Sequence, residues 1–255
     1  MCAGPGEMDD SYVIFSENGR SALVRREWRL ALARGLLDGT GCRPVGKGGR
    51  GEVMRFPFGD GWAILRRHQR GGLIRHVLRD TYLFTNRPLR EFATHVEVHS
   101  RGLSVPEPLG VRWQRVGPCF RGAIATREVE GEHLLDYLKA APDAPDDVLA
   151  SCGKVIRRMH DLGCWHADLQ LRNILVGPAG AYIIDFDHAR LVLSVGKVAR
   201  ARNLLRLRRS MDKNYVPLRF FEPICEGYGV DSLPNWLDRV YAAKGKASDA
   251  MSGRR

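Results

Sequence analysis

The first half of the chain has the hydrophobic pattern of β-strands. Residues 11–26 alternate between apolar and polar around Glu17-Asn18-Gly19, and two further apolar runs, 53–58 and 62–66, flank Gly59-Asp60-Gly61. A period of two interrupted by glycine with Asn or Asp is typical of β-hairpins. Residues 120–129 predict another strand, and helical spacing of apolar residues predicts helices at 27–37 and 88–100.

The second half has mostly helical periodicity. A Pro- and Asp-rich stretch at 142–147 precedes a predicted helix at 147–162, and residues 197–213 predict a basic helix. Between these helices lie two short predicted strands, 174–176 and 182–184. The pattern predicts an α+β protein with two lobes, a small, mainly-β N-lobe with one helix and a larger, mainly-α C-lobe. The predicted boundaries are 1–127, 128–243 and a disordered tail at 244–255.

Composition and charge narrow the class of protein. The 255 residues carry 40 Lys and Arg against 29 Asp and Glu, a formal net charge of +11 that favours an anionic partner such as a nucleotide, a nucleic acid, a phosphorylated lipid or a membrane surface. Six scattered cysteines without a C-x-x-C spacing indicate reduced thiols in a cytoplasmic protein. Acidic residues near the N-terminus argue against a signal peptide, and the chain has no apolar run of transmembrane length. Any membrane contact is therefore expected to be peripheral.

Two motifs in the second half indicate a reaction class. Residues 166–173 have the form H-x-D-L-x-x-x-N, and residues 185–187 follow as D-F-D. In kinase-like phosphotransferases the first motif supplies a catalytic Asp and a metal-binding Asn, and the second supplies the main Mg²⁺ ligand. We therefore predict Asp168 as the catalytic base and Asn173 and Asp185 as metal ligands. His166 is expected to support the loop, and Asp187 could add a metal contact or cap the next turn.

Two further features predict phosphate binding. Residues 46–53 match G-x-G-x-x-G-x-V, in which glycines let the backbone approach phosphates closely. Because a strand, a turn and another strand follow, this spacing favours a kinase loop over a dinucleotide-binding loop. Arg66 stands where kinases carry a strand lysine, and Glu91 in the next helix could orient it. The predicted cofactor-binding residues are Gly46, Gly48, Gly49, Gly51, Arg66 and Glu91, and the predicted cofactors are ATP and Mg²⁺. Together with the order of elements, these motifs predict a protein-kinase-like fold.

Differences between this sequence and the protein-kinase motifs indicate the kind of acceptor. Residue 167 is Ala rather than the Arg of H-R-D, and no A-P-E follows Asp185. Both differences favour a small-molecule kinase or an atypical protein kinase. The basic helix at 197–213, in which Leu204, Leu205 and Leu207 interleave with the cations, is typical of a membrane or anionic-substrate surface, although a solvated helix face explains it equally well.

Several segments together resemble the 3-deoxy-D-manno-octulosonic acid (Kdo) kinase family of lipopolysaccharide synthesis. The resemblance spans about residues 46–213, and its most specific parts are Arg70-Gly-Gly-Leu73 and Tyr82-Leu-Phe-Thr85. It implies ATP-dependent phosphorylation of a Kdo hydroxyl on a lipid A precursor, by a peripheral protein at the cytoplasmic side of the bacterial inner membrane. Asp168 would be the catalytic base, and the family's own motif carries Arg at the position of Arg66. Kdo-lipid A is therefore the expected partner, and no nucleic acid is expected. The basic side chains expected to contact it or the membrane are Arg70, Arg75, Arg206, Arg208 and Arg209.

Three alternatives stay open on sequence grounds. A heptose kinase of the lipopolysaccharide core would share every catalytic residue, and an atypical (RIO-like) protein kinase would share the motifs. A nucleotide-binding pseudokinase that serves as a scaffold is disfavoured because Asp168, Asn173 and Asp185 are intact.

Overall fold

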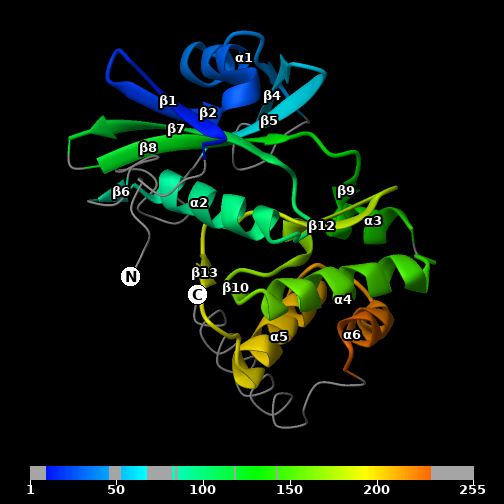
Figure 1. Ribbon diagram of the computed structural model, residues 1–255. Helices are drawn as coiled ribbons and strands as arrows, with labels where there is room; N and C mark the ends of the chain where they lie inside the picture. The colour runs from blue at the N-terminus through cyan, green and yellow to red at the C-terminus, as the bar shows by residue number, and fades with distance from the viewer. Residues whose placement is uncertain are drawn as a thin grey trace, which may run out of the picture. The chain divides into compact units, whose positions relative to one another are not determined.

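The structure is a computed structural model that describes residues 10–45, 53–67, 82–83, 86–117, 119–141 and 143–230 (Figure 1). The chain divides into two compact units, residues 1–100 with 106–129, and residues 101–105 with 130–255. The division after Val129 lies near the predicted boundary at residue 127. The glycine-rich loop at 46–51, Arg70, Arg75 and the predicted tail at 244–255 lie outside the described residues.

The first unit is built on an antiparallel sheet. Its strands lie in the order β1-β2-β7-β8-β5-β4-β3, and β6 pairs with β8. The pairings are antiparallel, and short turns join β1 to β2, β4 to β5 and β7 to β8. The bounds are β1 Tyr12–Glu17, β2 Arg20–Arg25, β3 Arg43–Pro44, β4 Val53–Phe58, β5 Gly61–Arg67, β6 Tyr82–Leu83, β7 Pro108–Val116 and β8 Cys119–Arg127.

Both predicted hairpins are confirmed. In the first, Glu17 pairs with Arg20 across a two-residue turn in which Asn18 has φ 50° and Gly19 has φ 73°. Positive φ at both central positions defines a type I′ turn, whose twist matches that of paired strands and which favours Asn-Gly. In the second hairpin, β4 and β5 pair from Val53 with Arg66 to Phe58 with Gly61.

Two features of this unit differ from the prediction. Residues 108–116, for which no strand is predicted, form β7, which lies between β2 and β8. The predicted helix at 27–37 is instead three short helical turns, a 3₁₀ turn at Arg26–Trp28, α1 at Arg29–Ala33 and a π-type turn at Arg34–Asp38. A Cβ atom at Gly35 would lie 2.3 Å from Cε2 of Phe56, so the last turn approaches the sheet too closely for a side chain there.

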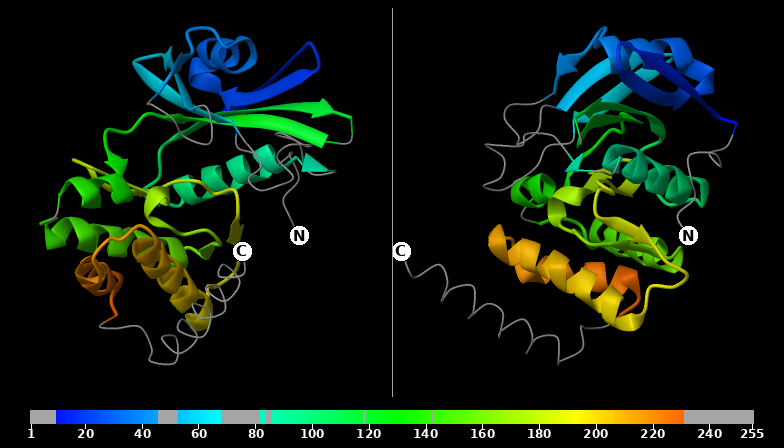
Figure 2. Two further views of the ribbon diagram at one scale, coloured as in Figure 1. Left: turned by 180° about the vertical axis from the view of Figure 1, so that it is seen from behind. Right: turned by 90° about the vertical axis from the view of Figure 1, so that its left-hand side faces the viewer.

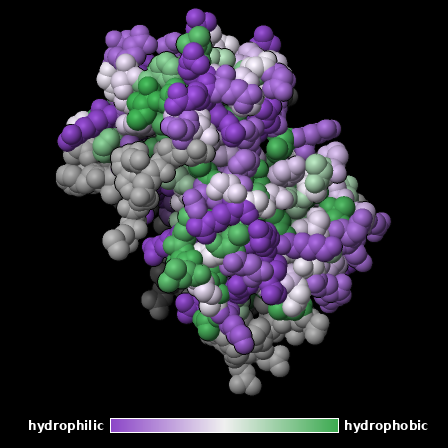
Figure 3. Space-filling view, in the orientation of Figure 1, coloured by the Kyte–Doolittle hydropathy of each residue, from purple (hydrophilic) through white to green (hydrophobic). Residues whose placement is uncertain are grey.

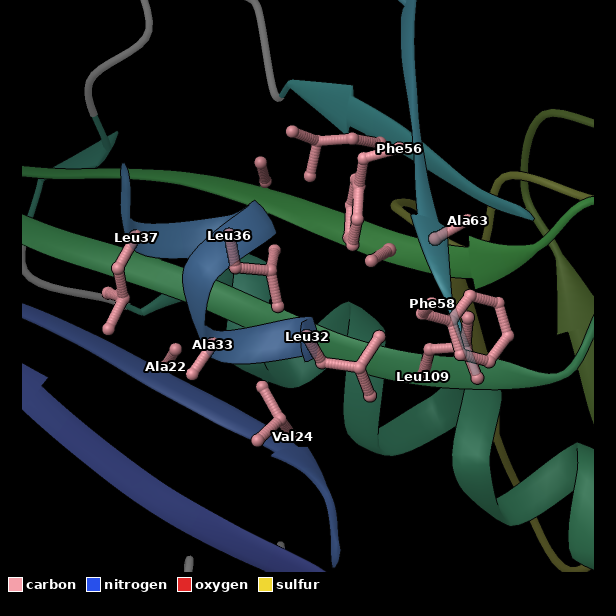
Figure 4. Packing of buried hydrophobic residues seen from close by; sticks show 13 residues of the cluster. Ala22, Val24, Leu32, Ala33, Leu36, Leu37, Phe56, Phe58, Ala63 and Leu109 are labelled. Carbon is pink, nitrogen blue, oxygen red and sulfur yellow. The ribbon is translucent and has the colours of Figure 1, made fainter. Parts of the chain in front are cut away.

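The sheet has hydrophobic clusters on its two faces, because side chains alternate along each strand. Ala22 and Val24 belong to one cluster and Leu23, between them, to the other. The first cluster packs the helical turns of 29–37 against Phe56 and Phe58 (Figure 4). On the opposite face lies α2, Arg87–Ser100, whose Phe92 belongs to the second cluster (Figure 2).

The second unit combines helices with two small sheets. Its helices are α3 Leu134–Ala140, α4 Asp146–Asp161, α5 Lys197–Lys213 and α6 Phe221–Tyr228. Helices α4 and α6 are in backbone contact, since a Cβ atom at Gly153 would lie 2.0 Å from the Ile224 carbonyl oxygen and one at Gly227 would lie 2.0 Å from that of Ala150. The predicted helix at 197–213 is confirmed. The strands are β9 Glu132–His133, β10 Cys164–His166, β11 Ile174–Gly177, β12 Gly180–Ile183 and β13 Ala189–Leu191.

The architecture confirms a mixed α+β chain with an N-terminal antiparallel sheet and a mostly helical C-terminal part. Among the described cysteines, Cys42, Cys152, Cys164 and Cys225 carry free thiols, and burial raises the pKa of Cys152 and Cys164 to about 12. Within the described ranges, every helix is too short or too polar to cross a bilayer.

The cluster beneath α1 provides a matched test of the core. Leu32 is fully buried, whereas Leu30, two residues earlier in the same helix, is 59% exposed. We expect Leu32→Ala to lower the free energy of unfolding by about 2–5 kcal/mol, because it removes buried methyl groups and leaves a cavity. Leu30→Ala should change it by less than about 0.5 kcal/mol. Chemical denaturation followed by fluorescence measures both, and equal effects would contradict this account of the packing.

Candidate active site

The predicted catalytic loop, residues 166–173, is held at both ends by strands of the second unit. Helix α4 ends before Gly163, whose φ of 78° turns the chain into β10, and a 3₁₀ turn at Leu171–Asn173 leads into β11. A left-handed residue after a helix favours glycine, which explains residue 163. The two strands that follow the loop, β11 and β12, form a hairpin that carries the chain to Asp185. The two motifs are therefore neighbours in space as well as in sequence.

His166 supports the loop from inside. Its side chain is fully buried, and its Nδ1 accepts a hydrogen bond from the Asp168 amide at 3.2 Å, so its Nε2 donates to the Ile184 carbonyl oxygen at 3.3 Å. Burial lowers the pKa of His166, while the nearby Asp185 carboxylate acts in the opposite direction. A buried neutral ring that bridges the two motifs agrees with a supporting role.

Asp168 has a half-exposed carboxylate with two side-chain partners. Its Oδ2 accepts from Gln170 Nε2 at 3.0 Å, and its Oδ1 lies 3.4 Å from Arg206 Nη1. The Asp168 side chain is 45% exposed and that of Arg206 is 50% exposed. This carboxylate is therefore oriented by its neighbours yet open to solvent, as a group that receives a proton from a substrate must be.

Asn173 and Asp185 are joined through the backbone. The amide of Ile184 donates to the Asn173 carbonyl oxygen at 3.0 Å, and Asn173 Nδ2 donates to the Asp168 carbonyl oxygen at 2.8 Å. Because the amide nitrogen is held in this way, the side-chain oxygen is the atom of Asn173 that suits a cation. Asp185 has φ 67°, a conformation uncommon for any residue other than glycine, and its Oδ1 accepts from the Asp187 amide at 3.4 Å.

These oxygen donors fit Mg²⁺. The ion takes one or two protein oxygens and completes its shell with waters and phosphate oxygens, so the side-chain oxygens of Asn173 and Asp185 would be a sufficient protein contribution. The described residues hold no cluster of three or more His, Cys, Asp or Glu side chains suited to a metal ion.

Helix α5 holds the loop through the side chains of Asn203, Arg206 and Ser210. The sequence patterns did not identify Asn203 and Ser210 as functional, and they assigned Arg206 to the acceptor or the membrane. Asn203 Nδ2 donates to the His166 carbonyl oxygen at 2.9 Å, and the hydroxyl of Ser210 accepts from the Leu171 amide at 3.2 Å. Arg206 lies between them in sequence and contacts Asp168. Positions 203, 206 and 210 share one helix face because their spacings of three and four match the helical repeat. That spacing was the available signal, but it does not say what the face contacts.

Asn203 is also part of a buried polar chain. Its Oδ1 accepts from His160 Nε2 at 3.0 Å, and His160 Nδ1 accepts from the Tyr228 hydroxyl at 2.8 Å. Burial lowers the pKa of His160 to about 4, so the ring is neutral near pH 7. Arg200 completes the support of α5 by donating to the carbonyl oxygens of Val195 and His160 and pairing with Asp161 at 2.6 Å. Helices α4, α5 and α6 are thus linked through one network to the loop.

The structure changes the interpretation of the leucines and arginines of α5. Of the open interpretations of this helix, a membrane surface made by its leucines does not fit, because Leu204, Leu205 and Leu207 are buried in the second unit. Of the expected acceptor-contacting arginines that lie in α5, Arg208 and Arg209 are half-buried, whereas Arg206 is exposed and lies beside Asp168.

The first unit brings together the other predicted pair. Arg66 on β5 forms a hydrogen-bonded ion pair with Glu91 on α2, whose side chain is only 3% exposed. The buried Glu91 carboxylate fixes the position of the Arg66 guanidinium. The contact is as predicted, and its role with phosphate stays a prediction.

Residues 41–228 match the lipopolysaccharide kinase (Kdo/WaaP) family. A 3-deoxy-D-manno-octulosonic acid kinase of Xylella fastidiosa (strain M12) is 38% identical over 180 residues, which cover 69% of this chain and 72% of that protein. Kinases of the same description from Stenotrophomonas maltophilia (strain R551-3) and Xanthomonas campestris pv. campestris (strain B100) are 37% and 36% identical, with the same coverage of both chains.

A solved structure of WaaP in complex with acyl carrier protein has a TM-score of 0.49 and 14% sequence identity, and covers 80% of this chain and 82% of that one. The sequence matches establish a kinase. This chain belongs to the lipopolysaccharide kinase (Kdo/WaaP) family.

The Asn203 contact generates a test of loop positioning. Asn203→Leu would leave the buried His166 carbonyl oxygen without its donor, at a cost of about 1–3 kcal/mol. We expect kcat to fall by about tenfold or more through misplacement of Asp168, with little change in the KM for ATP. Arg202→Leu, on the exposed neighbouring position, is the matched control. A folded Asn203→Leu protein with unchanged kcat would show that the contact serves stability alone.

Proposed function

We propose that this protein transfers the γ-phosphoryl group of ATP to a hydroxyl of Kdo on a lipid A precursor. Kdo carries a carboxylate and lipid A carries phosphates, so the acceptor is strongly anionic. The observation that carries the proposal is the pairing of Asp168, a half-exposed carboxylate, with the exposed cation Arg206 at 3.4 Å, in a chain whose relatives are described as Kdo kinases.

In the proposed reaction, Asp168 orients the acceptor hydroxyl and receives its proton. The hydroxyl oxygen bonds to the γ-phosphorus as the bond from phosphorus to the ADP oxygen breaks. Gln170 and Arg206 hold the carboxylate in place, and His166 fixes the backbone that carries it. Such positioning, with charge neutralisation, is the main requirement of phosphoryl transfer.

The remaining predicted residues serve the nucleotide in this proposal. Asn173 and Asp185 would hold Mg²⁺, which when bound neutralises the charge of the β- and γ-phosphates. Arg66, held in place by Glu91, would neutralise the charge of a nucleotide phosphate. Backbone amides of the glycine-rich loop, with Gly46, Gly48, Gly49 and Gly51, would bind the phosphates as well. In this proposal residues 1–127 form the nucleotide lobe and 128–243 the catalytic lobe.

Arg206 has a second role in this proposal. A guanidinium binds carboxylate and phosphate groups through paired N–H donors, and its half-exposed position beside Asp168 suits a group on the sugar that is being phosphorylated. Binding of the acceptor would then draw Arg206 towards the ligand without removing it from Asp168. We further propose a peripheral location at the cytoplasmic side of the inner membrane, where the acceptor's lipid anchor lies.

Transfer of radiolabelled phosphate from ATP tests both the identity of the acceptor and the role of Asp168 as the base. Kdo-lipid A, heptosylated core and a generic protein are offered in parallel, and label should appear on Kdo-lipid A. Asp168→Asn should lower kcat by about 10²–10⁴-fold, because the proton acceptor is lost. Asp136→Asn, at an exposed carboxylate in α3, should have little effect. Label on protein alone would overturn the sugar-kinase proposal.

Arg206→Gln tests the recognition of the anionic acceptor. We expect the KM for Kdo-lipid A to rise by about tenfold or more, since a hydrogen bond to a charged group contributes about 1.5–3 kcal/mol. The KM for ATP should stay nearly constant. Arg202→Gln removes a cation one helical turn away and serves as the control. Equal changes in both variants would mean that only the overall charge of the helix matters.

A further inference from the structure

An exposed apolar segment follows β13 in the second unit. Of the ten large hydrophobic side chains that are exposed among the described residues, four lie within residues 191–198, and the side chain of Leu193 is fully exposed. The other six are spread over separate elements, which is usual for a protein surface. Figure 3 shows hydrophobic residues gathered on this unit where Figure 1 places β13 and the start of α5. The four are Leu191, Val192, Leu193 and Val198.

Both ends of this apolar segment are fixed. On one side β13 pairs with β10, and the Val192 amide donates to the Gly163 carbonyl oxygen at 2.9 Å. On the other side Val195 is buried, and its carbonyl oxygen accepts from Arg200 Nε at 2.8 Å. The backbone contacts therefore hold the tip at Leu193 away from the core, and its exposure is a property of the ordered fold.

Positive charge surrounds the apolar tip. Arg190 and Lys197 are exposed on its two sides, and residues 188–211 contain no Asp or Glu. Apolar side chains between exposed cations match the surface of an anionic bilayer, where cations meet the headgroups and apolar groups enter the acyl boundary.

We propose that residues 190–198 form a docking surface for an anionic lipid bilayer, with Leu193 inserted among the lipids and Arg190 and Lys197 at the headgroups. This assigns membrane contact to a segment different from the leucines of α5. Exposed cations on both sides of the apolar tip, with the nearby Asp161 carboxylate already paired to Arg200, favour an anionic lipid over a second copy of this chain or its own residues 231–255.

The docking surface, which rests on the proposed function for its purpose, is linked directly to Asp168. Leu191 pairs with Cys164 and Ala189 pairs with His166, so the apolar end of β13 lies two residue steps, about 7 Å, from the start of the 166–173 loop. Docking through residues 190–198 would thus keep Asp168 close to the bilayer surface, where a lipid-anchored sugar is presented.

Co-sedimentation of the full-length protein with vesicles tests this proposal. The vesicles contain phosphatidylethanolamine and phosphatidylglycerol, and phosphatidylcholine vesicles are the comparison; neither nucleotide nor sugar is present. We expect Leu193→Asp to weaken binding to the anionic vesicles by about tenfold or more. Leu30→Asp, at an exposed leucine of the first unit, should bind as the unaltered protein does. Arg190→Glu combined with Lys197→Glu should weaken binding and reduce its dependence on salt.

Several outcomes would overturn the proposal. One is unaltered binding of both Leu193→Asp and the milder Leu193→Ser, and another is failure of the unaltered protein to bind anionic vesicles. A dimer in solution that Leu193→Asp converts to monomers would assign the surface to a second copy. Binding that appears only after removal of residues 231–255 would assign it to that segment. Because the assay contains no acceptor, none of these results depends on whether Kdo is the sugar phosphorylated.

Discussion

The hydrogen bond from Asn203 to the His166 carbonyl oxygen is the contact on which the candidate site depends. It lies at the point where α5 meets the start of the 166–173 loop, and both partners are buried. A buried carbonyl oxygen without a donor is costly, so the contact fixes the distance between helix and loop. From that point the His166 ring reaches Ile184 and the Asp168 amide, so the positions of Asp168 and of the segment before Asp185 follow from it. The chain His160–Tyr228 extends the constraint to α4 and α6.

Helix α5 serves two purposes on different faces. Leu204, Leu205 and Leu207 are buried and give the helix its place in the core, whereas Asn203, Arg206 and Ser210 contact the loop. The many cations of α5 therefore do not form a single surface. Arg200 is a structural clamp on Asp161 and Arg206 is the cation beside Asp168. A helix that carries both core and site transmits any change in packing directly to the loop, which makes core substitutions in α5 less tolerable than their volume alone would suggest.

Local chemistry explains which parts of the molecule could be predicted from the sequence. The Asn18-Gly19 turn, the Gly59–Gly61 turn and the bounds of α5 follow from rules that act within a few residues, and the motif spacing predicted the contact of Arg66 with Glu91. Strand β7 was missed because it begins at Pro108, although Leu109, Val111 and Trp113 do alternate with glycine or polar residues. What makes it a strand is pairing with β2, more than 80 residues earlier in the chain, and with β8.

The role of Asn203 was also missed because it depends on a distant partner. Helical spacing identifies a shared face without identifying what that face contacts. The exposed tip at Leu193 depends on Gly163, whose Cβ would lie 2.1 Å from the Val192 carbonyl oxygen, and no short-range pattern reports such an approach.

In the proposed docking, the pairing of β10 with β13 connects the 166–173 loop to the segment that meets the membrane. A kinase that acts on a free sugar can take its substrate from any direction, but a lipid-anchored sugar reaches only a short distance above the bilayer. The loop that carries Asp168 must then lie close to whatever part of the protein meets the membrane. A pair of strands that fixes the apolar tip at one end and the start of the loop at the other satisfies this requirement with few residues. A pair of strands is stiffer than a flexible linker. Docking of residues 190–198 on the membrane would therefore also fix the position of Asp168 relative to the bilayer. The same reasoning explains why an apolar side chain such as Leu193 is exposed at this place in spite of the solubility cost that it brings.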